Sequence, residues 1–221
     1  MRKQVITALT VIGAASITAV GVSAQGDRAT ESVPSAPTVY IAQLKPLNSD
    51  AASTHTSGIA RFTVRGDSLT ISINVRNAPA NMTHLQHFHG FTDGRDATCA
   101  TQDADANHDG VVDLMETEPM SGTTMVPFTA DPVSMEVVTD SYPKSNAGGS
   151  YRYTKTVSLS ALEKAFAEKF SGQKLDLTHR VVYIHGVPSD TKLPSTAASL
   201  GTIPAQVTLP IACGKIEAVN R

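Results

Sequence analysis

The chain contains no tryptophan, and aromatic residues of all kinds make up only 5% of its 221 residues. A hydrophobic core therefore has to be built mainly from valine, isoleucine, leucine and alanine. An internal repeat is also lacking, so nothing favours a repeat architecture. The 18 basic and 20 acidic residues leave little net charge. This balance gives no reason to expect nucleic acid or an anionic membrane as a partner, and a small molecule is expected instead.

The N-terminus combines two early positive charges, Arg2 and Lys3, with an apolar stretch across residues 5–22. It ends in the small residues V-S-A, which suit cleavage before Gln25. This pattern predicts a secretory signal peptide at residues 1–24. An uncleaved anchor is the alternative, although threonine, serine and glycine dilute the apolar stretch. No cysteine lies at the cleavage site, which disfavours a lipoprotein anchor.

Removal of the signal peptide takes away two basic residues and no acidic ones, leaving 16 minus 20, or a net charge of -4. The mature protein is then expected to be secreted or periplasmic. Residues 25–37 are polar and rich in proline and serine, and are expected to form a disordered leader. Residues 38–221 are long enough for one well-buried domain. The sequence leaves the oligomeric state open.

The only two cysteines are Cys99 and Cys213. Because the chain is expected to reach an oxidising compartment, we expect them to form one disulfide. Two free thiols are the alternative.

Short β-branched runs with period-two alternation are typical of strands that have one buried face and one wet face. In residues 68–76, every second residue from Leu69 to Val75 is apolar, and the residues between them are polar. A tight hairpin turn is expected at Gly66. Besides the histidine-rich segment described below, the expected strands cover residues 38–44, 58–64, 68–76, 123–128, 134–139, 150–157, 180–184 and 206–216.

One helix is expected among these strands. Ser160 and Glu163 form a capping-box pattern, an apolar stripe follows, and Gly172 supplies a stop. The stripe consists of Leu159, Leu162, Phe166 and Phe170. The fold class predicted is therefore all-β, a sandwich or barrel with one inserted short helix.

An acidic segment, Asp105 to Glu116, matches the twelve-residue calcium loop of EF-hand proteins. Gly110 stands at position 6, where the loop turns sharply, and Glu116 at position 12 can offer both carboxylate oxygens. A solvated acidic loop without calcium is the alternative. A second, paired loop is lacking, which favours a weak structural site over a sensor. The expected calcium ligands are Asp105, Asn107, Asp109, Val111 through its carbonyl, Asp113 and Glu116.

A pair of histidines, His87 and His89, is spaced i and i+2. On an extended strand both imidazoles point the same way, so both can reach one metal ion. A third histidine from a distant strand, His185, would complete a copper-site pattern. Taken alone, a pair with this spacing is more often incidental.

Three segments resemble the Cu,Zn superoxide dismutase family. His84 to Asp93 reads H-L-Q-H-F-H-G-F-T-D and is similar to the family's H-G-F-H-V-H-E-F-G-D. His179 to His185 reads H-R-V-V-Y-I-H and resembles its G-R-x-x-V-V-H. Leu209 to Ile216 reads L-P-I-A-C-G-K-I and resembles its closing R-L-A-C-G-V-I. The resemblance extends from about residue 38 to 216 with a long unmatched middle, and implies a Greek-key β-sandwich.

The resemblance also implies roles for individual residues. It implies that His87, His89 and His185 are copper ligands and the residues of catalysis. His84 matches a histidine that braces the site without binding metal. It also implies a disulfide between Cys99 and Cys213.

Two departures from the family concern the metals and the substrate. The stretch that supplies the bridging histidine and the zinc ligands is here the acidic loop, so a zinc site is not expected. His108 is the only histidine in that loop and is a further candidate copper ligand, although position 4 of such a loop normally points outward. Pro210 stands where the family has the arginine that steers superoxide, and Arg180 matches a different, structural arginine.

The sequence thus predicts an exported copper-binding protein that resembles superoxide dismutase and contains structural calcium. Superoxide is its expected substrate if it is an enzyme. Without the bridging histidine and the steering arginine, catalysis itself is left open. The alternatives are a noncatalytic, calcium-stabilised β-sandwich module and a copper storage or delivery protein.

Overall fold

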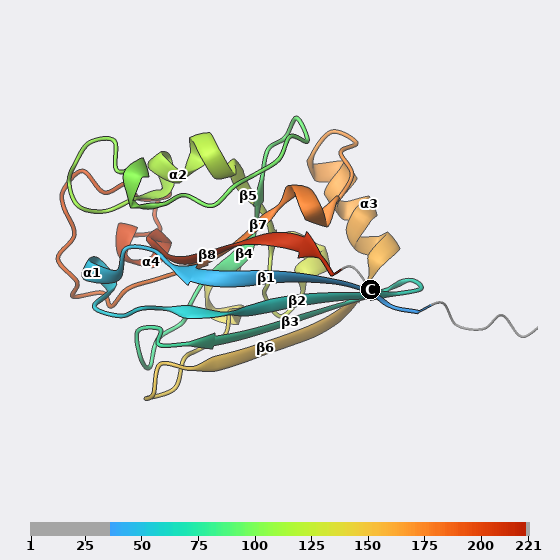
Figure 1. Cartoon of the computed structure of the whole chain (residues 1–221), viewed down its shortest axis with the longest axis horizontal. Coiled ribbons are helices and arrows are strands. Elements are labelled where there is room, and N and C mark those ends of the chain that lie inside the picture. Colours follow the sequence, from blue (N-terminus) through green and yellow to red (C-terminus); the bar gives the residue numbers. More distant parts are fainter. Residues whose placement is uncertain (1–35, 220–221) are drawn as a thin grey trace, which may run out of the picture. The chain divides into compact units, whose positions relative to one another are not determined.

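The computed structural model describes residues 36–219 (Figure 1). The predicted signal peptide and most of the predicted leader lie outside the described residues. Eight antiparallel strands dominate this part of the chain. The strands are β1 (Thr38–Pro46), β2 (Ser57–Arg65), β3 (Ser68–Arg76), β4 (Gln86–Gly90), β5 (Thr123–Pro127), β6 (Tyr151–Ser158), β7 (Val181–His185) and β8 (Pro210–Ala218).

The strands form one curled sheet in the order β5-β4-β7-β8-β1-β2-β3-β6. Curling brings its two halves face to face around a shared core. The ring centroid of Phe62 on β2 lies 5.1 Å from that of Phe88 on β4, although β2 and β4 are not neighbours in this order.

 Three strands, β7, β8 and β1, lie between β4 and β2 in the sheet. The contact between the two rings therefore crosses the core and does not join neighbouring strands.

The alternation predicted for β3 is confirmed. Every second residue from Leu69 to Val75 is buried in the main core, and the residues between them face outward. The hairpin between β2 and β3 turns at Gly66, whose φ of 55° lies in the left-handed region that glycine adopts without strain. The described chain is thus an all-β fold with one curled sheet, as the sequence predicts.

One expected strand is wrong, and another is wrong in part. Residues 134–139 form no strand; two short 3-10 turns lie there, η2 (Pro132–Ser134) and η3 (Thr139–Ser141). No neighbouring strand offers this segment a ladder of hydrogen bonds, so its β-branched residues are not sufficient to make it extended. Residues 206–216 begin as a short helix, α4 (Ala205–Thr208), before β8 starts at Pro210.

The helix content is larger than the single helix expected. Besides α4, there are α1 (Ser49–Ala52), α2 (Leu114–Ser121) and α3 (Leu159–Lys169), with further 3-10 turns at η1 (Gln102–Ala104) and η4 (Leu177–His179). None of the helices within residues 36–219 has the length and apolar character needed to cross a membrane.

The expected helix is α3, but its cap differs from the prediction. Ser158 is the N-cap, and its Oγ accepts a hydrogen bond from the Ala161 amide at 3.1 Å. The amide of Ser160 donates instead to Asp67 in the β2–β3 turn at 2.8 Å. The helix thus starts two residues earlier than predicted, because the turn before β3 supplies an acceptor for its first amides.

Candidate metal centre

Three histidines project from the outer face of the sheet. On β4, Phe88 points into the main core, so His87 and His89 project from the opposite face. On the neighbouring strand β7, Ile184 likewise points into the core and His185 points outward. Strand alternation therefore places all three imidazoles on one side of the same strand pair.

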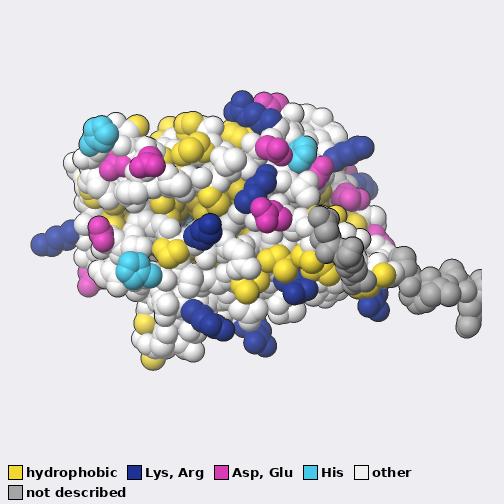
Figure 2. Space-filling view, in the orientation of Figure 1, with side chains coloured by type: hydrophobic (Ala, Val, Ile, Leu, Met, Phe, Trp, Pro, Cys, Tyr) yellow, Lys and Arg dark blue, Asp and Glu magenta, His cyan; other side chains and the backbone are white. Residues whose placement is uncertain are grey.

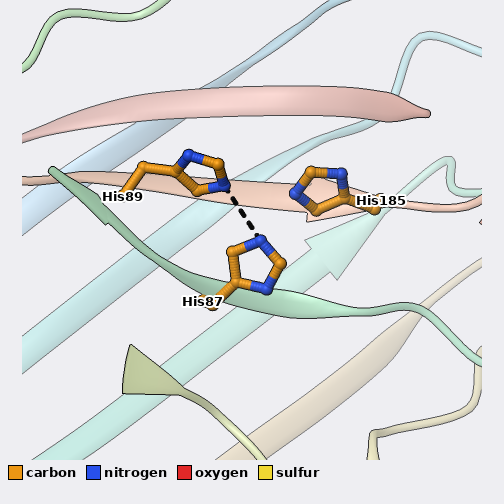
Figure 3. Close-up of side chains that lie close together, drawn as sticks. All are labelled: His87, His89 and His185. Atoms are coloured by element: carbon orange, nitrogen blue, oxygen red, sulfur yellow. Dashed lines mark hydrogen bonds between the residues drawn. The ribbon is translucent and has the colours of Figure 1, made fainter. Parts of the chain in front are cut away.

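The three imidazoles converge (Figure 3). Each offers a nitrogen that lies within 4.8 Å of those of the other two. Among residues 36–219, no other set of three or more histidine, cysteine, aspartate or glutamate side chains meets this condition. His87, His89 and His185 are only 5, 6 and 5% exposed, so a ligand that reaches them has to be small. A buried cluster of this kind can bind a metal ion.

Backbone carbonyls fix the orientation of two of the rings. His89 Nδ1 lies 3.1 Å from the carbonyl oxygen of Gly122, and His185 Nδ1 lies 2.7 Å from that of Thr208. Because a carbonyl only accepts, each Nδ1 is the protonated nitrogen of a neutral ring. Each Nε2 is left with a lone pair. The buried Nε2 of His185 has no hydrogen-bond partner, as expected of a nitrogen oriented for a cation.

His87 completes the cluster in a different way. Its Nε2 lies 3.0 Å from His89 Nε2 (Figure 3). The same Nε2 lies 3.2 Å from the hydroxyl of Thr124. Since His89 Nε2 has a lone pair, His87 Nε2 is the donor in this contact. The buried Nδ1 of His87 then has a lone pair and no hydrogen-bond partner. A cation among the rings would replace the proton that the two Nε2 atoms share.

Burial keeps these imidazoles neutral. It lowers the pKa of His89 to about 3 and that of His185 to about 4, and it lowers the pKa of His87 well below its ordinary value. The charge that His185 would acquire lowers the pKa of His87 and His89 further. Protons therefore compete little with a metal ion for these nitrogens at neutral pH.

A tyrosine outside the sequence prediction supports the cluster. The ring of Tyr183 lies edge-on to His89 with 4.8 Å between centroids. Its hydroxyl lies 2.8 Å from Ser121 Oγ and accepts a hydrogen bond from the Ala100 amide at 3.0 Å. Tyr183 thus ties β7 to the end of α2 and to the segment after Cys99.

The predicted disulfide between Cys99 and Cys213 is present, with 5.7 Å between the Cα atoms. It attaches the covering segment, which is residues 91–122 between β4 and β5 on the outer face of the sheet, to β8. A second, smaller core lies beneath this segment and includes Val112, Val181 and Tyr183. The disulfide is compatible with an extracellular or other oxidising compartment.

His84 is buried beside the cluster. Its Nδ1 lies 3.0 Å from the backbone oxygen of His185, and its Nε2 lies 2.9 Å from that of Pro79. Burial lowers the pKa of His84. His84 contacts the backbone of one histidine of the cluster without joining the cluster itself.

Gly122, at the end of α2, is held close to β4. Its φ is 68°, and a Cβ atom at this position would lie 2.1 Å from the carbonyl oxygen of Gly90. Only glycine therefore lets this backbone approach β4 and present its own carbonyl to His89. Helix α2 begins inside the acidic loop, so one rigid element connects the loop to the cluster.

The acidic loop is organised by its own side chains. Asp105 accepts hydrogen bonds from the amides of Asp109 and Gly110 at 3.1 and 2.9 Å. Asn107 also accepts from Asp109, at 2.9 Å, and Asp109 from Val111, at 3.0 Å. Gly110 has a φ of 91°, which permits the sharp turn. The side-chain oxygens at positions 1, 3 and 5 thus bond within the loop.

The last two acidic residues of the loop form a reciprocal cap of α2. Asp113 accepts from the amide of Glu116 at 3.2 Å, and Glu116 accepts from that of Asp113 at 3.1 Å. Glu116 also accepts from Ala106 at 2.8 Å. Among the described residues, the loop carboxylates do not form a tight cluster like that of the histidines. Asp113 further accepts from Ala198, which ties the loop to the segment after β7.

The remaining sequence candidates lie outside the cluster. His108 is exposed in the acidic loop with a φ of 58°. Pro210 is buried at the start of β8, and its carbonyl accepts from Asn48 at 2.9 Å. Arg180 is buried, and its guanidinium donates to the backbone oxygen of Lys174 at 3.0 Å, as expected of a structural arginine.

Sequence reasoning missed the residues that orient the histidines. Tyr183 was detectable, because it stands two residues before His185 on the same strand and so shares its face. Gly122 and Thr208 act through backbone carbonyls, for which side-chain identity gives no signal. Ser121 was missed because no helix was expected there, whereas α2 includes Pro119 and ends at Ser121.

Comparison with known proteins gives no assignment: no family model matches the chain, and no curated protein matches it.

Proposed function

We propose that this chain is an exported copper protein of the Cu,Zn superoxide dismutase type, which converts superoxide to oxygen and peroxide. The observation that carries the proposal is the buried cluster of His87, His89 and His185. Its neutral imidazoles, two of them fixed by backbone carbonyls, suit both oxidation states of copper. Imidazole binds several metals, and the resemblance of the three sequence segments favours copper among them.

The strand order supports the same fold type. Strand β3 pairs with β6 and not with β4, and β4 pairs with β7. Connections that skip neighbouring strands and return to the sheet further on are a property of Greek-key topology. The disulfide supports export, because such bonds persist in oxidising compartments.

Bound copper would supply a one-electron couple, so that two superoxide anions and two protons yield one oxygen molecule and one hydrogen peroxide. The chain's own residues hold the site. Gly122 and Thr208 keep His89 and His185 oriented through their Nδ1 atoms. The Thr124 hydroxyl, 3.2 Å from His87 Nε2, is the polar side chain available to hydrogen-bond a small ligand there. Near-complete burial of the histidines restricts the site to small molecules.

Calcium in the loop from Asp105 to Glu116 is the second part of the proposal. The loop matches the EF-hand pattern in sequence, and its side chains at positions 1, 3 and 5 bond to loop amides. Calcium there would stabilise α2 and, through Gly122, the orientation of His89. Zinc has no place in this proposal.

Copper storage or delivery is the alternative that one observation favours. Pro210 replaces the arginine expected in the resembling family and is buried, so this position offers no cation to attract superoxide. A carrier would keep the three-histidine cluster and need no steering charge.

Superoxide consumption by copper-loaded protein separates these functions. We expect a rate that lies below the diffusion limit, changes little with ionic strength, and is abolished in His87→Ala. His55→Ala, which alters an exposed histidine outside the cluster, should keep the wild-type rate. Copper-loaded wild type that consumes superoxide no faster than His87→Ala would exclude the dismutase and favour the carrier.

A further inference from the structure

One half of the sheet is basic. Strands β1, β2, β3 and β6 contain no aspartate or glutamate, in a chain that has more acidic than basic residues. The basic residues on these four strands are Lys45, Arg61, Arg65, Arg76, Arg152 and Lys155. Figure 2 shows dark-blue side chains and no magenta ones over β3 and β6.

Three of these arginines border one groove on the outer face. Arg61, Arg76 and Arg152 are exposed and line a shallow groove of about 940 Å³ that contains no acidic side chain. Within residues 36–219, none of the three forms an ion pair with a carboxylate. Their charges are therefore available to a ligand. Residues with amide and hydroxyl side chains also line the groove: Gln43, Ser57, Ser72, Asn74, Asn146 and Ser150.

Strand register sets the spacing of the charges. Arg61 pairs with Ser72, and Arg152 with Asn74, which precedes Arg76 by two residues on the same face. Strand geometry then puts the Cα atoms of Arg76 and Arg152 about 8 Å apart, and those of Arg61 and Arg152 about 12 Å apart. Arg152 is also oriented, because its Nε donates to Asn74 Oδ1 at 2.7 Å. An extended ligand with repeated negative charges matches this row better than a single small anion.

We propose that this groove binds an acidic polysaccharide. Three unpaired guanidiniums recognise sulfate or carboxylate groups, and the amides and hydroxyls that line the groove can hydrogen-bond sugar hydroxyls. The groove offers no exposed aromatic ring on which a base could stack, since Tyr151 in its lining is only 9% exposed. Ile59 is its one exposed large apolar residue, which is too little to insert into a membrane.

The proposal is independent of the metal centre. The groove lies on the outer face of β2, β3 and β6, whereas the histidines lie on β4 and β7. Binding would tether an exported protein to an anionic matrix and leave the three-histidine cluster accessible.

The test measures binding of the full mature chain to heparin as a function of salt. Arg61→Gln/Arg76→Gln/Arg152→Gln should bind at least tenfold more weakly than wild type, and the slope of log affinity against log salt should fall by about 2 to 3. The control Arg95→Gln/Lys164→Gln/Lys174→Gln removes equal charge from exposed positions elsewhere and should bind like wild type. Unchanged melting temperature and copper content would show that both variants fold.

Four results would overturn the proposal. The first two are no heparin binding by wild type at low ionic strength and an equal loss of heparin affinity in both variants. The other two are equal binding of neutral dextran, and binding of single-stranded DNA or anionic vesicles through the same arginines as tightly as heparin. The last result would identify a nucleic acid or lipid partner instead. Retention of heparin that depends on the groove arginines and exceeds that of the other probes would support it.

Discussion

Individual residues orient the three histidines through contacts on their far sides. His89 and His185 each donate from Nδ1 to a backbone carbonyl, which leaves each Nε2 with a lone pair that could bind a metal ion. Tyr183 packs against His89 and bonds to the end of α2, so it fixes the helix whose terminal Gly122 holds that ring. Partners of this kind typically change metal affinity by 10- to 100-fold when removed.

Removing the hydroxyl of Tyr183 should therefore weaken metal binding while the ring remains packed. Tyr183→Phe leaves Ser121 and the Ala100 amide without their shared partner, and we expect about tenfold weaker copper binding by competition titration. Tyr153→Phe is the matched control, because it loses a buried bond to Thr129 in the core beside β6. Equal copper affinity in both variants would remove Tyr183 from the support of the site.

The buried histidines also predict how stability depends on pH. Folding lowers the pKa of His89 to about 3 and of His185 to about 4, whereas the unfolded chain takes up these protons near pH 6.5. The free energy of unfolding is thus highest above pH 6.5. It falls as the pH falls towards 4, by about 1.4 kcal/mol per pH unit for each histidine.

Urea denaturation of metal-free protein at pH 7.5 and 5 checks this dependence. Wild type should lose more stability between the two pH values than His89→Gln, which has no imidazole to protonate at that position. The same pH dependence in both proteins would contradict the assigned burial.

Among the elements, α2 has the largest role, because it joins the acidic loop at one end to the histidine cluster at the other. Asp113 and Glu116 cap its start, and Gly122 follows its end. A cation in the loop would stabilise the native state by mass action.

Calcium chelation should lower the melting temperature of wild type, and should matter much less in Glu116→Gln. The glutamine keeps an oxygen that accepts the loop amides but loses the charge and the second carboxylate oxygen. Glu118→Gln, on the exposed side of the same helix, is the control and should respond like wild type. An equal response of all three proteins to chelator would place calcium elsewhere or nowhere.

The strands were largely predictable, because the alternation from Leu69 to Val75 reports a half-buried sheet directly. Segment 134–139 failed because a strand also needs a partner, which local sequence does not specify. The histidine cluster was predictable from spacing and resemblance. The carbonyls of Gly122 and Thr208 were not, since they depend on tertiary contacts.

In the domain as a whole, the curled sheet separates a shared core from the three-histidine cluster on its outer face. The covering segment depends on the disulfide, which joins Cys99 and Cys213 across a sequence separation of 114. Sequence predicted this bond from the count of cysteines and the expected compartment. It did not predict that Ala100, next to Cys99, bonds to Tyr183.

Removing the disulfide should destabilise the domain strongly. For Cys99→Ala/Cys213→Ala we expect a loss of about 4 to 5 kcal/mol in the free energy of unfolding, because a long loop regains its entropy in the unfolded chain. Urea denaturation with and without reductant measures this loss, and reductant should have no further effect on the variant. A loss below about 1 kcal/mol would show that the bond does little to hold the covering segment.

The identity of the bound metal shows whether His87, His89 and His185 form a copper site. Mature protein prepared without metal should bind one Cu(II) per chain, with an electron paramagnetic resonance spectrum that shows coupling to imidazole nitrogens. We expect this signal to disappear in His87→Ala and in His185→Ala and to persist in His55→Ala. A copper signal that survives the loss of either cluster histidine, or protein that takes up no copper, would contradict it.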